Sequence, residues 1–412
     1  MTPYPKYKPS GIEWIGDIPE HWEVKRLKRL AKILNGRDHK EVWDENGMYP
    51  VIGTGGIFGW ATDYLHSGPS VILGRKGTID KPQFITTPFW SVDTAYFTDI
   101  FPDINPKYFY YLCTTINFEE YKYGSAVPSM TQETLNQIQF SITKDLDEQT
   151  AIADYLDAKT AAIDELIAAK QKLIELYEEE KTALINHAVT KGLNSNAPMK
   201  DSGIEWLGEI PAHWEVKKLS WCFNTIGSGT TPQAGNEDYY FNGEHNWLLT
   251  GDLTDGEIHL TSKKVTHLAL DKHTSLKKYP VNSIVIAMYG ATIAKLGILK
   301  IETTVNQACC VLGDPNNIDY LFAFYTLLAA RKEIINMSYG GGQPNISQEL
   351  LRSFRIQVPP TINEQQSIVT YIETESKKID TQITNTTQLI ELLTEYRTAL
   401  ISEVVTGKIK IV

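Results

Sequence analysis

Two short groups of residues in the first third of the chain have types and spacing that could support catalysis. Asp103, Glu120 and Lys122 follow the acid–acid–lysine pattern of many nuclease sites, in which carboxylates hold Mg²⁺. Asn105-Pro-Lys-Tyr108 is similar to the Asn-Pro-Pro-Tyr loop of amino-group methyltransferases, but its third residue is lysine. No strand followed by a glycine-rich turn for S-adenosylmethionine precedes it. A nuclease or methylase that acts by itself is therefore one hypothesis.

Other catalytic motifs are missing from the sequence. The only Gly-Lys pair, Gly407-Lys408, lacks the upstream glycine of a phosphate-binding loop. His259, His267 and His273 do not have the spacing of metal ligands, and no Gly-x-Ser-x-Gly nucleophile elbow occurs. We therefore expect no catalytic residue, no metal and no cofactor in this chain.

Length and composition describe an ordinary globular chain of several domains. It has 412 residues, of which 42% are hydrophobic and 22% are charged. No run of about 18 apolar residues is present, so no membrane span is expected. Four cysteines without a C-x-x-C pair, and a polar start rich in proline, predict a reduced cytoplasmic protein.

The net charge of −11 is unevenly distributed. Residues 147–193 carry 5 basic and 10 acidic groups and residues 363–412 carry 5 and 7, so these two segments hold −7 of the −11. The rest of the chain is nearly neutral and can still gather basic residues on one face. Net charge therefore does not exclude a nucleic-acid partner.

The chain repeats itself, and the repeats define its organisation. Residues 10–27 return as residues 202–219 with 14 of 18 positions identical. A second repeat relates Glu148-Gln149 to Glu364-Gln365 and continues through 173–176 and 389–392. Between these anchors the two halves diverge. The plan is a variable unit and a shared segment, each present twice.

Both shared segments read as long helices. Each opens with the pattern of a capping box, Asp145-x-x-Glu148 and Thr361-x-x-Glu364. Apolar residues at steps of four and seven make a stripe on each helix. Because the two stripes match, we expect the helices to pair as an intramolecular coiled coil, although each helix could instead pack on its own domain. The expected helix-pairing residues are Ile152, Leu156, Ile163, Ile167, Ile174, Ile368, Ile372, Ile379, Ile383 and Ile390.

The variable units read as mixed α/β domains with short strands. Val71-Ile-Leu73 and Ile284-Val-Ile-Ala287 are β-branched runs bounded by glycine or serine. Basic and polar loops follow these strands, such as Arg75-Lys-Gly-Thr78 in the first half. Lysine and arginine neutralise phosphates, and arginine, asparagine and glutamine read base edges in the major groove. Loops that recur after the same strand favour DNA binding over ordinary surface charge.

With these repeats, the sequence resembles the specificity subunit of type I restriction–modification systems over its whole length. The resemblance rests on the Ser-Gly-Ile-Glu-Trp-x-Gly-x-Ile-Pro-x-His-Trp-Glu-Val opening, present twice, and on the Glu-Gln-x-x-Ile helix starts at 148 and 364. It also rests on the loop Gly229-Thr-Thr-Pro232. The first half departs from the pattern, because it has Asn35-Gly-Arg-Asp38 at that place.

The resemblance implies a fold, a function and partners. The fold would be α+β, with two α/β target-recognition domains in a pseudo-two-fold arrangement, joined by two long antiparallel helices. Their boundaries would be 1–145 and 196–361 for the domains, and 146–195 and 362–412 for the conserved spacer helices. Each domain would read one half of a bipartite, asymmetric site on double-stranded DNA. The chain would be no enzyme, and would dock two adenine methyltransferase subunits, which carry S-adenosylmethionine, and motor–endonuclease restriction subunits.

We expect the DNA contacts in loops after matched strands. The expected residues are Asn35, Arg37, Lys40, Thr54, Arg75, Lys76, Thr78, Ser129 and Gln132 in the first domain, and Ser228, Thr230, Thr231, Tyr289, Thr292, Lys295, Gln343, Asn345 and Ser347 in the second. A third hypothesis is a coiled-coil scaffold whose variable units bind proteins, and salt-sensitive DNA binding would count against it.

Overall fold

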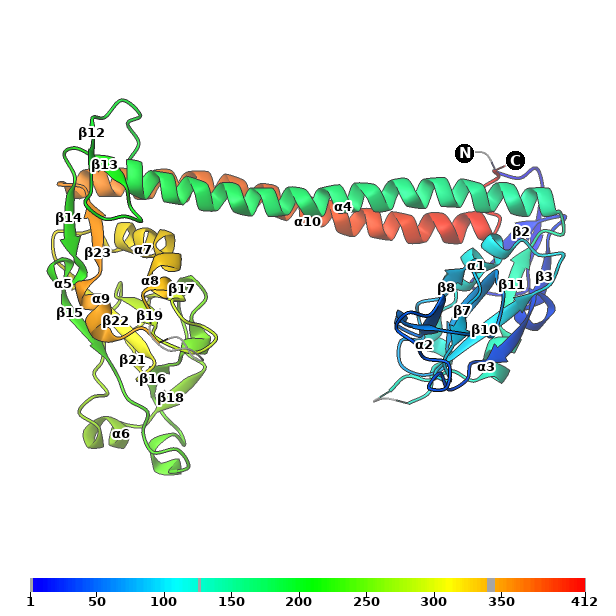
Figure 1. The fold of residues 1–412 in the computed structure, drawn as a ribbon, viewed down its shortest axis with the longest axis horizontal. Helices are drawn as coiled ribbons and strands as arrows, with labels where there is room; N and C mark the ends of the chain where they lie inside the picture. Colours follow the sequence, from blue (N-terminus) through cyan, green and yellow to red (C-terminus); the bar gives the residue numbers. More distant parts are fainter. Residues whose placement is uncertain (1–2, 125–126, 339–344, 412) are drawn as a thin grey trace. The chain divides into compact units, whose positions relative to one another are not determined.

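The computed structural model describes residues 3–124, 127–338 and 345–411, which form an α+β fold, as predicted. They fall into two compact units, unit 1 with residues 1–172 and 386–412 and unit 2 with residues 173–385. Each unit contains an α/β part and one portion of each long helix, α4 (Leu146–Lys191) and α10 (Ile362–Val405) (Figure 1). The compact units thus divide both long helices, whereas the boundaries predicted from the sequence keep each helix whole.

Unit 1 is built on a four-stranded antiparallel sheet with the order β4-β10-β7-β8, next to a three-stranded sheet with the order β6-β5-β9. Two strand pairs, β1-β2 and β3-β11, complete it. The strands are β1 (Tyr7–Pro9), β2 (Asp17–Pro19), β3 (Glu23–Arg26), β4 (Ala31–Asn35), β5 (Tyr49–Gly53), β6 (Gly56–Ala61), β7 (Ser70–Gly74), β8 (Gln83–Ile85), β9 (Trp90–Ser91), β10 (Ala95–Ile100) and β11 (Gln139–Ile142). The short helices are α1 (Pro106–Thr114), α2 (Phe118–Tyr121) and α3 (Gln132–Gln137).

Unit 2 repeats this plan with one added strand. Its sheets have the orders β15-β22-β19-β20-β17 and β18-β16-β21, with the pairs β12-β13 and β14-β23. The strands are β12 (Met199–Asp201), β13 (Glu209–Pro211), β14 (Glu215–Lys218), β15 (Phe223–Ser228), β16 (His245–Leu248), β17 (Gly256–Ile258), β18 (Lys263–Val265), β19 (Ile284–Ala287), β20 (Leu296–Leu299), β21 (Thr304–Val305), β22 (Cys309–Pro315) and β23 (Arg355–Val358). The short helices are α5 (Leu219–Cys222), α6 (His267–Lys272), α7 (Tyr320–Ala329), α8 (Arg331–Asn336) and α9 (Gln348–Ser353). The added β17 lies in residues 249–262, where unit 1 has only the turn between β5 and β6.

The two β-branched runs recognised in the sequence form central strands. Every residue of β7 and of β19 is buried, because strands and helices cover both faces. In unit 1 the helix α1 packs into the same core, and the Tyr111 hydroxyl donates to the Asp157 carboxylate of α4 at 2.5 Å. This bond holds the α/β part of unit 1 against the helix.

A carboxylate at the start of each long helix binds the Trp of the repeated opening segment. In unit 1 the Glu148 carboxylate accepts hydrogen bonds from the Tyr4 hydroxyl at 2.7 Å and from Trp22 Nε1 at 3.2 Å, and lies 3.0 Å from His21 Nε2. Burial acts to raise the pKa of Glu148, but hydrogen bonds from Thr143, Tyr4, His21 and Trp22 outweigh it and lower that pKa. The ionised carboxylate is therefore the form that stabilises unit 1.

Unit 2 makes the same contact with matching residues. Glu364 accepts from Trp214 Nε1 at 2.8 Å and lies 3.0 Å from His213 Nε2. Both indoles, Trp22 and Trp214, are fully buried. The repeated His-Trp and Glu of the sequence are thus one polar cluster, formed once in each unit.

The glutamine that follows each of these carboxylates is fully buried, and its hydrogen bonds within the described residues go to backbone groups. Gln149 accepts from the Asn105 amide at 2.7 Å and donates to the Thr143 carbonyl at 3.0 Å. Gln365 accepts from the Asp319 amide at 2.7 Å and donates to the Pro359 carbonyl at 3.0 Å. Each glutamine therefore ties the first turn of its helix to two loops of its own α/β part.

The predicted capping boxes form only in part. Asp145 accepts from the Asp147 amide at 2.9 Å, and Thr361 Oγ1 accepts from the Glu364 amide at 3.3 Å, so both residues cap their helices. Glu148 and Glu364, however, bind the Trp and His side chains described above instead of returning to the cap. The sequence pattern does not distinguish these two uses of the glutamate.

The end of each long helix packs against the opposite copy of the Pro-x-His-Trp segment. In unit 2, α4 ends at Lys191 and is followed by Gly192 (φ +72), which lies against Trp214. In unit 1, α10 is followed by Gly407 (φ +75), which lies against Pro19 and Trp22. A left-handed glycine at this position is a common helix C-terminus. Each α/β part is therefore closed by the start of one helix and the end of the other.

The two helices run antiparallel in both units (Figure 1). In unit 1, Arg397 of α10 donates to both carboxylate oxygens of Asp164 on α4, at 2.8 and 3.1 Å. In unit 2, Lys181 of α4 donates to Asp380 of α10 at 2.7 Å. These exposed pairs are each worth only about 0.2–1 kcal/mol, so they fix register more than stability.

The ten predicted helix-pairing residues differ in burial and in what they contact. Six are buried, namely Ile152, Leu156, Ile163, Ile368, Ile372 and Ile379, and four are half-buried, namely Ile167, Ile174, Ile383 and Ile390. Ile152 and Leu156 share a core with the α/β part of unit 1, and Ile368 and Ile372 with that of unit 2. Each stripe therefore begins on its own α/β part.

The long helices are also not membrane spans. Within the described residues, no helix combines the length and the apolar composition that crossing a membrane requires.

One glycine in each unit lets two backbone segments cross. A Cβ on Gly36, after β4, would lie 2.0 Å from the Val92 carbonyl oxygen, and a Cβ on Gly229, after β15, would lie 1.6 Å from the Val305 carbonyl oxygen. Only glycine leaves room for this approach. The crossing is the common element of Asn35-Gly-Arg-Asp38 and the Gly229-Thr-Thr-Pro232 loop.

Replacing Glu148 by glutamine should lower the free energy of unfolding by about 2 kcal/mol near neutral pH, because hydrogen bonds to a charged acceptor are lost. The pKa of Glu148 is lower in the folded state, so its contribution is complete above the unfolded pKa of about 4.3 and is lost as the pH falls through the folded pKa. The thermal unfolding midpoints of the two proteins should therefore differ at neutral pH and converge as the pH falls through the folded pKa of Glu148. Glu165→Gln, on the exposed face of α4, is the control, and a difference that stays constant with pH would contradict this account.

Gly36→Ala should destabilise the protein by roughly 2 kcal/mol or more, because the added methyl group overlaps the Val92 carbonyl. Gly55→Ala is the matched control, since its Cβ would meet nothing within 4 Å. Urea unfolding followed by tryptophan fluorescence measures both. Equal midpoints for the two variants would show that the crossing at Gly36 is not close in solution.

Candidate nucleic-acid interface

In unit 1, two of the predicted DNA-contacting loops meet at the residues that lead into β10. The Arg37 amide donates to the Ser91 carbonyl at 2.8 Å, and Trp90 Nε1 donates back to the Arg37 carbonyl at 3.2 Å. The Arg75 and Lys76 amides both donate to the Thr94 carbonyl at 3.0 Å. Loops that are far apart in sequence are thus fixed to one short segment, residues 90–95.

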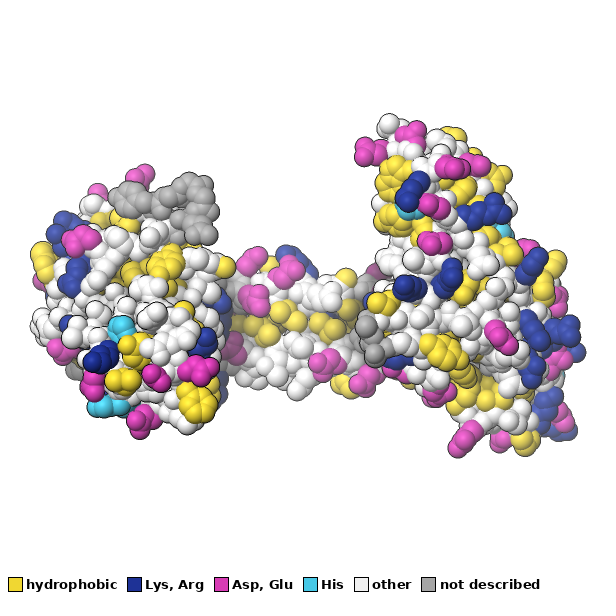
Figure 2. Space-filling view, turned by 90° about the horizontal axis from the view of Figure 1, so that it is seen from below, with side chains coloured by type: hydrophobic (Ala, Val, Ile, Leu, Met, Phe, Trp, Pro, Cys, Tyr) yellow, Lys and Arg dark blue, Asp and Glu magenta, His cyan; other side chains and the backbone are white. Residues whose placement is uncertain are grey.

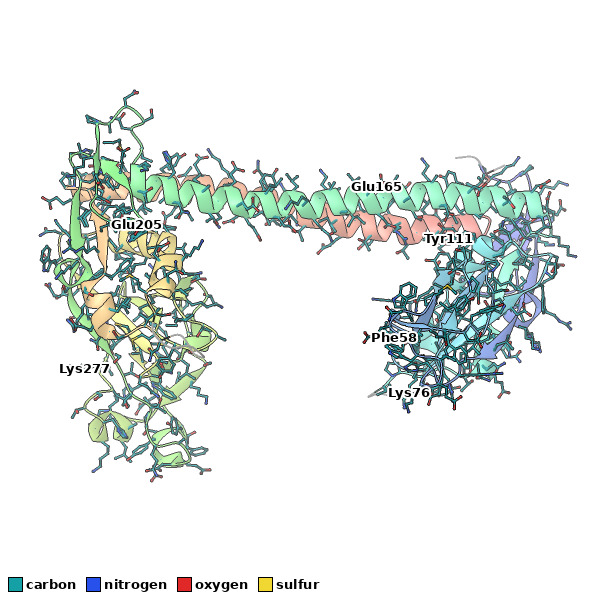
Figure 3. The ribbon with its side chains drawn as sticks, in the orientation of Figure 1. Phe58, Lys76, Tyr111, Glu165, Glu205 and Lys277 are labelled. Atoms are coloured by element: carbon teal, nitrogen blue, oxygen red, sulfur yellow. The ribbon has the colours of Figure 1, made fainter. Side chains whose placement is uncertain are left out.

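Two more predicted residues join the Arg75-Lys-Gly loop. Lys76 and Ser129 form an antiparallel bridge, and the Met130 amide donates to the Arg75 carbonyl at 2.9 Å. Thr54 Oγ1, in the turn between β5 and β6, donates to the Lys76 carbonyl at 3.4 Å. Figure 3 shows Lys76 on the side of unit 1 away from α4 and α10, whereas Tyr111 lies next to these helices.

Unit 2 repeats this arrangement. The Met288 amide donates to the Ala308 carbonyl at 2.8 Å, and the Ile346 amide donates to the Met288 carbonyl at 2.7 Å. Tyr289 and Asn345 form the antiparallel bridge that corresponds to the one between Lys76 and Ser129. Trp247 Nε1 donates to the Thr230 carbonyl at 3.3 Å, but Trp247 lies on β16, whereas Trp90, which bonds to the Arg37 carbonyl, lies on β9.

The predicted residues divide by exposure. Ten are exposed: Asn35, Arg37, Lys40, Arg75, Lys76, Thr78, Thr231, Lys295, Asn345 and Ser347. Seven are half-buried: Thr54, Ser129, Gln132, Ser228, Thr230, Tyr289 and Thr292. Gln343 lies outside the described residues. Thr292 and Lys295 belong to one turn between β19 and β20, in which the Lys295 amide donates to the Thr292 carbonyl at 2.9 Å.

Some of these side chains are already used by the fold. The Gln132 amide group donates to the Ile33 carbonyl at 2.8 Å, and Ser347 caps α9 through the Leu350 amide at 3.0 Å. Thr231 Oγ1 donates to Gln307, and Lys40 lies 3.6 Å from Asp38. These residues hold the loops in place, which leaves Arg37, Lys76 and Asn345 as the more available candidates for contact.

Basic and acidic side chains are interspersed on the face shown in Figure 2. Next to Arg37, the Lys40 amide and the charge of Lys40 lower the pKa of Asp38, so this carboxylate is ionised at neutral pH. The positive charge available to a ligand therefore comes from the lysine and arginine side chains of single loops, and not from a broad basic surface.

The sequence analysis missed an exposed aromatic cluster in unit 1. His39, Trp43 and Phe58 have ring centroids 5.3 to 5.9 Å apart, and the Trp43 and Phe58 rings are stacked. Phe58 also lies 3.3 Å from the position of a Cβ on Gly53, beside Thr54. The cluster therefore joins the loop after β4 to strand β6. The available signal was the group of large apolar residues Ile57, Phe58 and Trp60 within four positions.

The residues considered for catalysis have structural roles in unit 1. The Asn105 side chain accepts from the Lys107 and Tyr108 amides and caps α1, and Tyr108 is fully buried. Glu120 accepts from Asn117 at 2.7 Å, and Lys122 pairs with Glu119. No cluster of three or more possible metal ligands occurs in the part of the chain that the structure describes.

The cysteines are buried and remain thiols at neutral pH. Burial raises the pKa of Cys222 to about 11 and that of Cys309 and Cys310 to about 12, and it also raises the pKa of Cys113. A thiol is a poor nucleophile compared with a thiolate. These residues pack in the cores.

Comparison with known proteins identifies the family. The model of the type I restriction modification DNA specificity domain matches residues 19–176 and 211–393, that is, once in each half of the chain. The MjaIX specificity subunit of a type I restriction enzyme of Methanocaldococcus jannaschii is 25% identical over 96% of this chain and 95% of its own length. The EcoprrI specificity subunit of Escherichia coli is 26% identical, over 34% of this chain and 36% of its own length.

Solved structures share the fold. A chain from a study of complex assembly and conformational transition of the type I R-M system has a TM-score of 0.74 at 12% identity, over 95% of this chain and 99% of that chain. The HsdS subunit of Thermoanaerobacter tengcongensis has a TM-score of 0.57 at 13% identity, over 95% and 98%. Together with the duplicated family match, these findings show that the chain belongs to the type I restriction–modification DNA specificity family and is a specificity subunit.

Proposed function

We propose that each unit reads one half of a bipartite, asymmetric site on double-stranded DNA through the loops that meet before β10 and before β22. One observation carries the proposal. The same backbone contacts recur in the two units, with Lys76 bridged to Ser129 in one and Tyr289 bridged to Asn345 in the other. Two domains with the same backbone contacts and different exposed side chains can recognise two different DNA sequences.

The partners that we propose are two adenine methyltransferase subunits and the motor–endonuclease subunits. Exposed apolar side chains on the helices support a protein-binding role there. In unit 1 these include Leu166, Leu389 and Leu392, of which Leu392 is 61% exposed. The excess of acidic residues in the two helical segments also favours a protein partner over DNA. S-adenosylmethionine would be bound by the methyltransferase, in the cytoplasm.

We further propose that this chain has no catalytic activity of its own. The structural roles of Asn105, Glu120 and Lys122, and the burial of the cysteines, support this. Purified chain should neither cleave target DNA with Mg²⁺ nor methylate it with S-adenosylmethionine. When the methyltransferase partner is added, the mixture should methylate the target DNA but should still not cleave it. Cleavage or methylation by the chain alone, retained through a size-exclusion step, would contradict the proposal.

Deletion of the gene should abolish N6-methyladenine at one split motif in host DNA, as read by methylation-sensitive long-read sequencing. Restoring the gene with both Arg37→Ala and Lys76→Ala should relax one half-site only, because both residues lie in unit 1. Lys6→Ala is the control, since it removes an exposed charge of unit 1 in the β1-β2 region, outside the predicted loops. Equal relaxation of both half-sites would contradict the assignment of one unit to each half-site.

A further inference from the structure

The two units present different chemistry at positions whose backbone geometry is the same. Under the proposed function, on which this inference rests, the side chains at these positions decide which bases each unit reads. Three features match around the bridge: the amide bond of Arg75 or Met288 to the Thr94 or Ala308 carbonyl, the bridge of Lys76 or Tyr289, and the left-handed glycine that follows, Gly77 or Gly290. Arg37 and Thr230 each follow the glycine at which two backbone segments cross, Gly36 or Gly229. The paired residues are therefore equivalent.

Unit 1 has a cation at each of three equivalent positions, and unit 2 has none. Arg37 corresponds to Thr230, and the Arg75-Lys76 pair corresponds to Met288-Tyr289. All three cationic side chains are exposed, whereas Met288 is 7% exposed and Thr230 and Tyr289 are half-buried. The two units therefore differ in the charge and in the shape of the side chains at equivalent backbone positions.

The cations of unit 1 are available to a ligand. Arg75 donates from one guanidinium nitrogen to the Asp93 carbonyl at 3.0 Å, which holds the guanidinium group at the loop. Its remaining N–H groups can still donate to a ligand. Among the described residues, no side-chain hydrogen bond or ion pair is found for Arg37 or Lys76. Arginine and lysine donate to N7 and O6 of guanine, which are the acceptors that distinguish this base in the major groove.

The corresponding surface of unit 2 suits a different base pair. Tyr289 and Thr230 are half-buried, and an aromatic ring or a threonine methyl group can make an apolar contact with the C5-methyl group of thymine. Asn345, exposed and bridged to Tyr289, carries the amide that pairs with N6 and N7 of adenine. Lys295, which is exposed, lies in the same connection between β19 and β20 as Tyr289, and a lysine can neutralise a phosphate.

We propose that unit 1 reads guanine through N7 and O6 in its half-site, and that unit 2 reads an A·T pair through the thymine methyl group and the adenine edge. The two half-sites of the target therefore differ in the atoms that the protein senses. Lys76 is the specificity-determining residue of unit 1, and Tyr289 with Asn345 is the corresponding pair of unit 2.

Base analogues that remove single atoms test this proposal with the wild-type chain in complex with its methyltransferase. The half-site of unit 1 is first assigned as the one whose methylation pattern relaxes in Lys76→Ala. In duplexes that carry the mapped target, 7-deazaguanine should weaken binding about tenfold at one guanine of that half-site. Deoxyuridine in place of thymidine should weaken binding about fourfold in the other half-site, because one methyl contact is lost.

A variant separates base contacts from phosphate contacts. Lys76→Ala should bind the 7-deazaguanine duplex and the unmodified duplex equally, whereas Lys6→Ala should keep the tenfold difference. If Lys76 contacts a phosphate, Lys76→Ala will weaken binding to every duplex and retain the sensitivity to 7-deazaguanine, which overturns the proposal.

Three other outcomes also overturn the proposal while the proposed function stands. They are a half-site of unit 1 without guanine, analogue effects in the opposite half-sites, and no relaxation in Lys76→Ala. Failure of the proposed function is distinct from these, because the complex would then show no split motif and no preference for any target duplex.

Discussion

A carboxylate at the first turn of each long helix, buried in unit 1 and half-buried in unit 2, makes the contact on which the structure depends. Glu148 and Glu364 each hold the indole of the repeated opening segment, and the next residue, a glutamine, ties the same helical turn to backbone of the α/β part. A charge placed among aromatic rings is stabilising only while its hydrogen bonds are complete. The geometry around it is therefore narrowly specified, and so is the angle at which each α/β part meets its helix.

This constraint explains how the chain can vary. The residues that fix the frame lie in the shared segments, near the helix starts and ends. The residues that we propose to contact DNA lie on loops at the other side of the sheets, held by backbone hydrogen bonds and by a glycine crossing. Backbone bonds place few demands on side-chain identity, so exposed positions such as Lys76 and Tyr289 can differ without loss of the fold. Recognition can thus change while the assembly surface stays the same.

Much of the fold could be predicted because the sequence contains an internal repeat, whose two copies can be compared with each other. Two copies of His-Trp and of Glu-Gln, in the same alternation, predicted two similar α/β parts and two long helices, and the α+β fold confirms this. The buried strands β7 and β19 also followed from their β-branched runs. The tertiary use of Glu148 could not be predicted, since a capping box and a buried cluster leave the same local pattern. The packing of Ile152 and Leu156 on the α/β part was expected only as the alternative to helix pairing, because a helical stripe does not identify the surface on which it packs.

The candidate site was predicted in part. The sequence placed the loops after matched strands, and the structure brings Arg37, Thr54, Lys76 and Ser129 together around one segment. The sequence did not predict that the Gln132 side chain would donate to the Ile33 carbonyl. It also did not predict that His39, Trp43 and Phe58 would form an aromatic cluster. Both depend on contacts between residues far apart in the chain, which local spacing does not encode.

The most direct test of the central claim is hydrogen–deuterium exchange of the complex with its methyltransferase, with and without a duplex that carries the mapped target. The account predicts new protection in residues 35–40 and 75–78 of unit 1 and in residues 228–231 and 288–292 of unit 2, with little change in β3, β11, β14 and β23. Protection that appears only outside these loops, or in one unit alone, would contradict it.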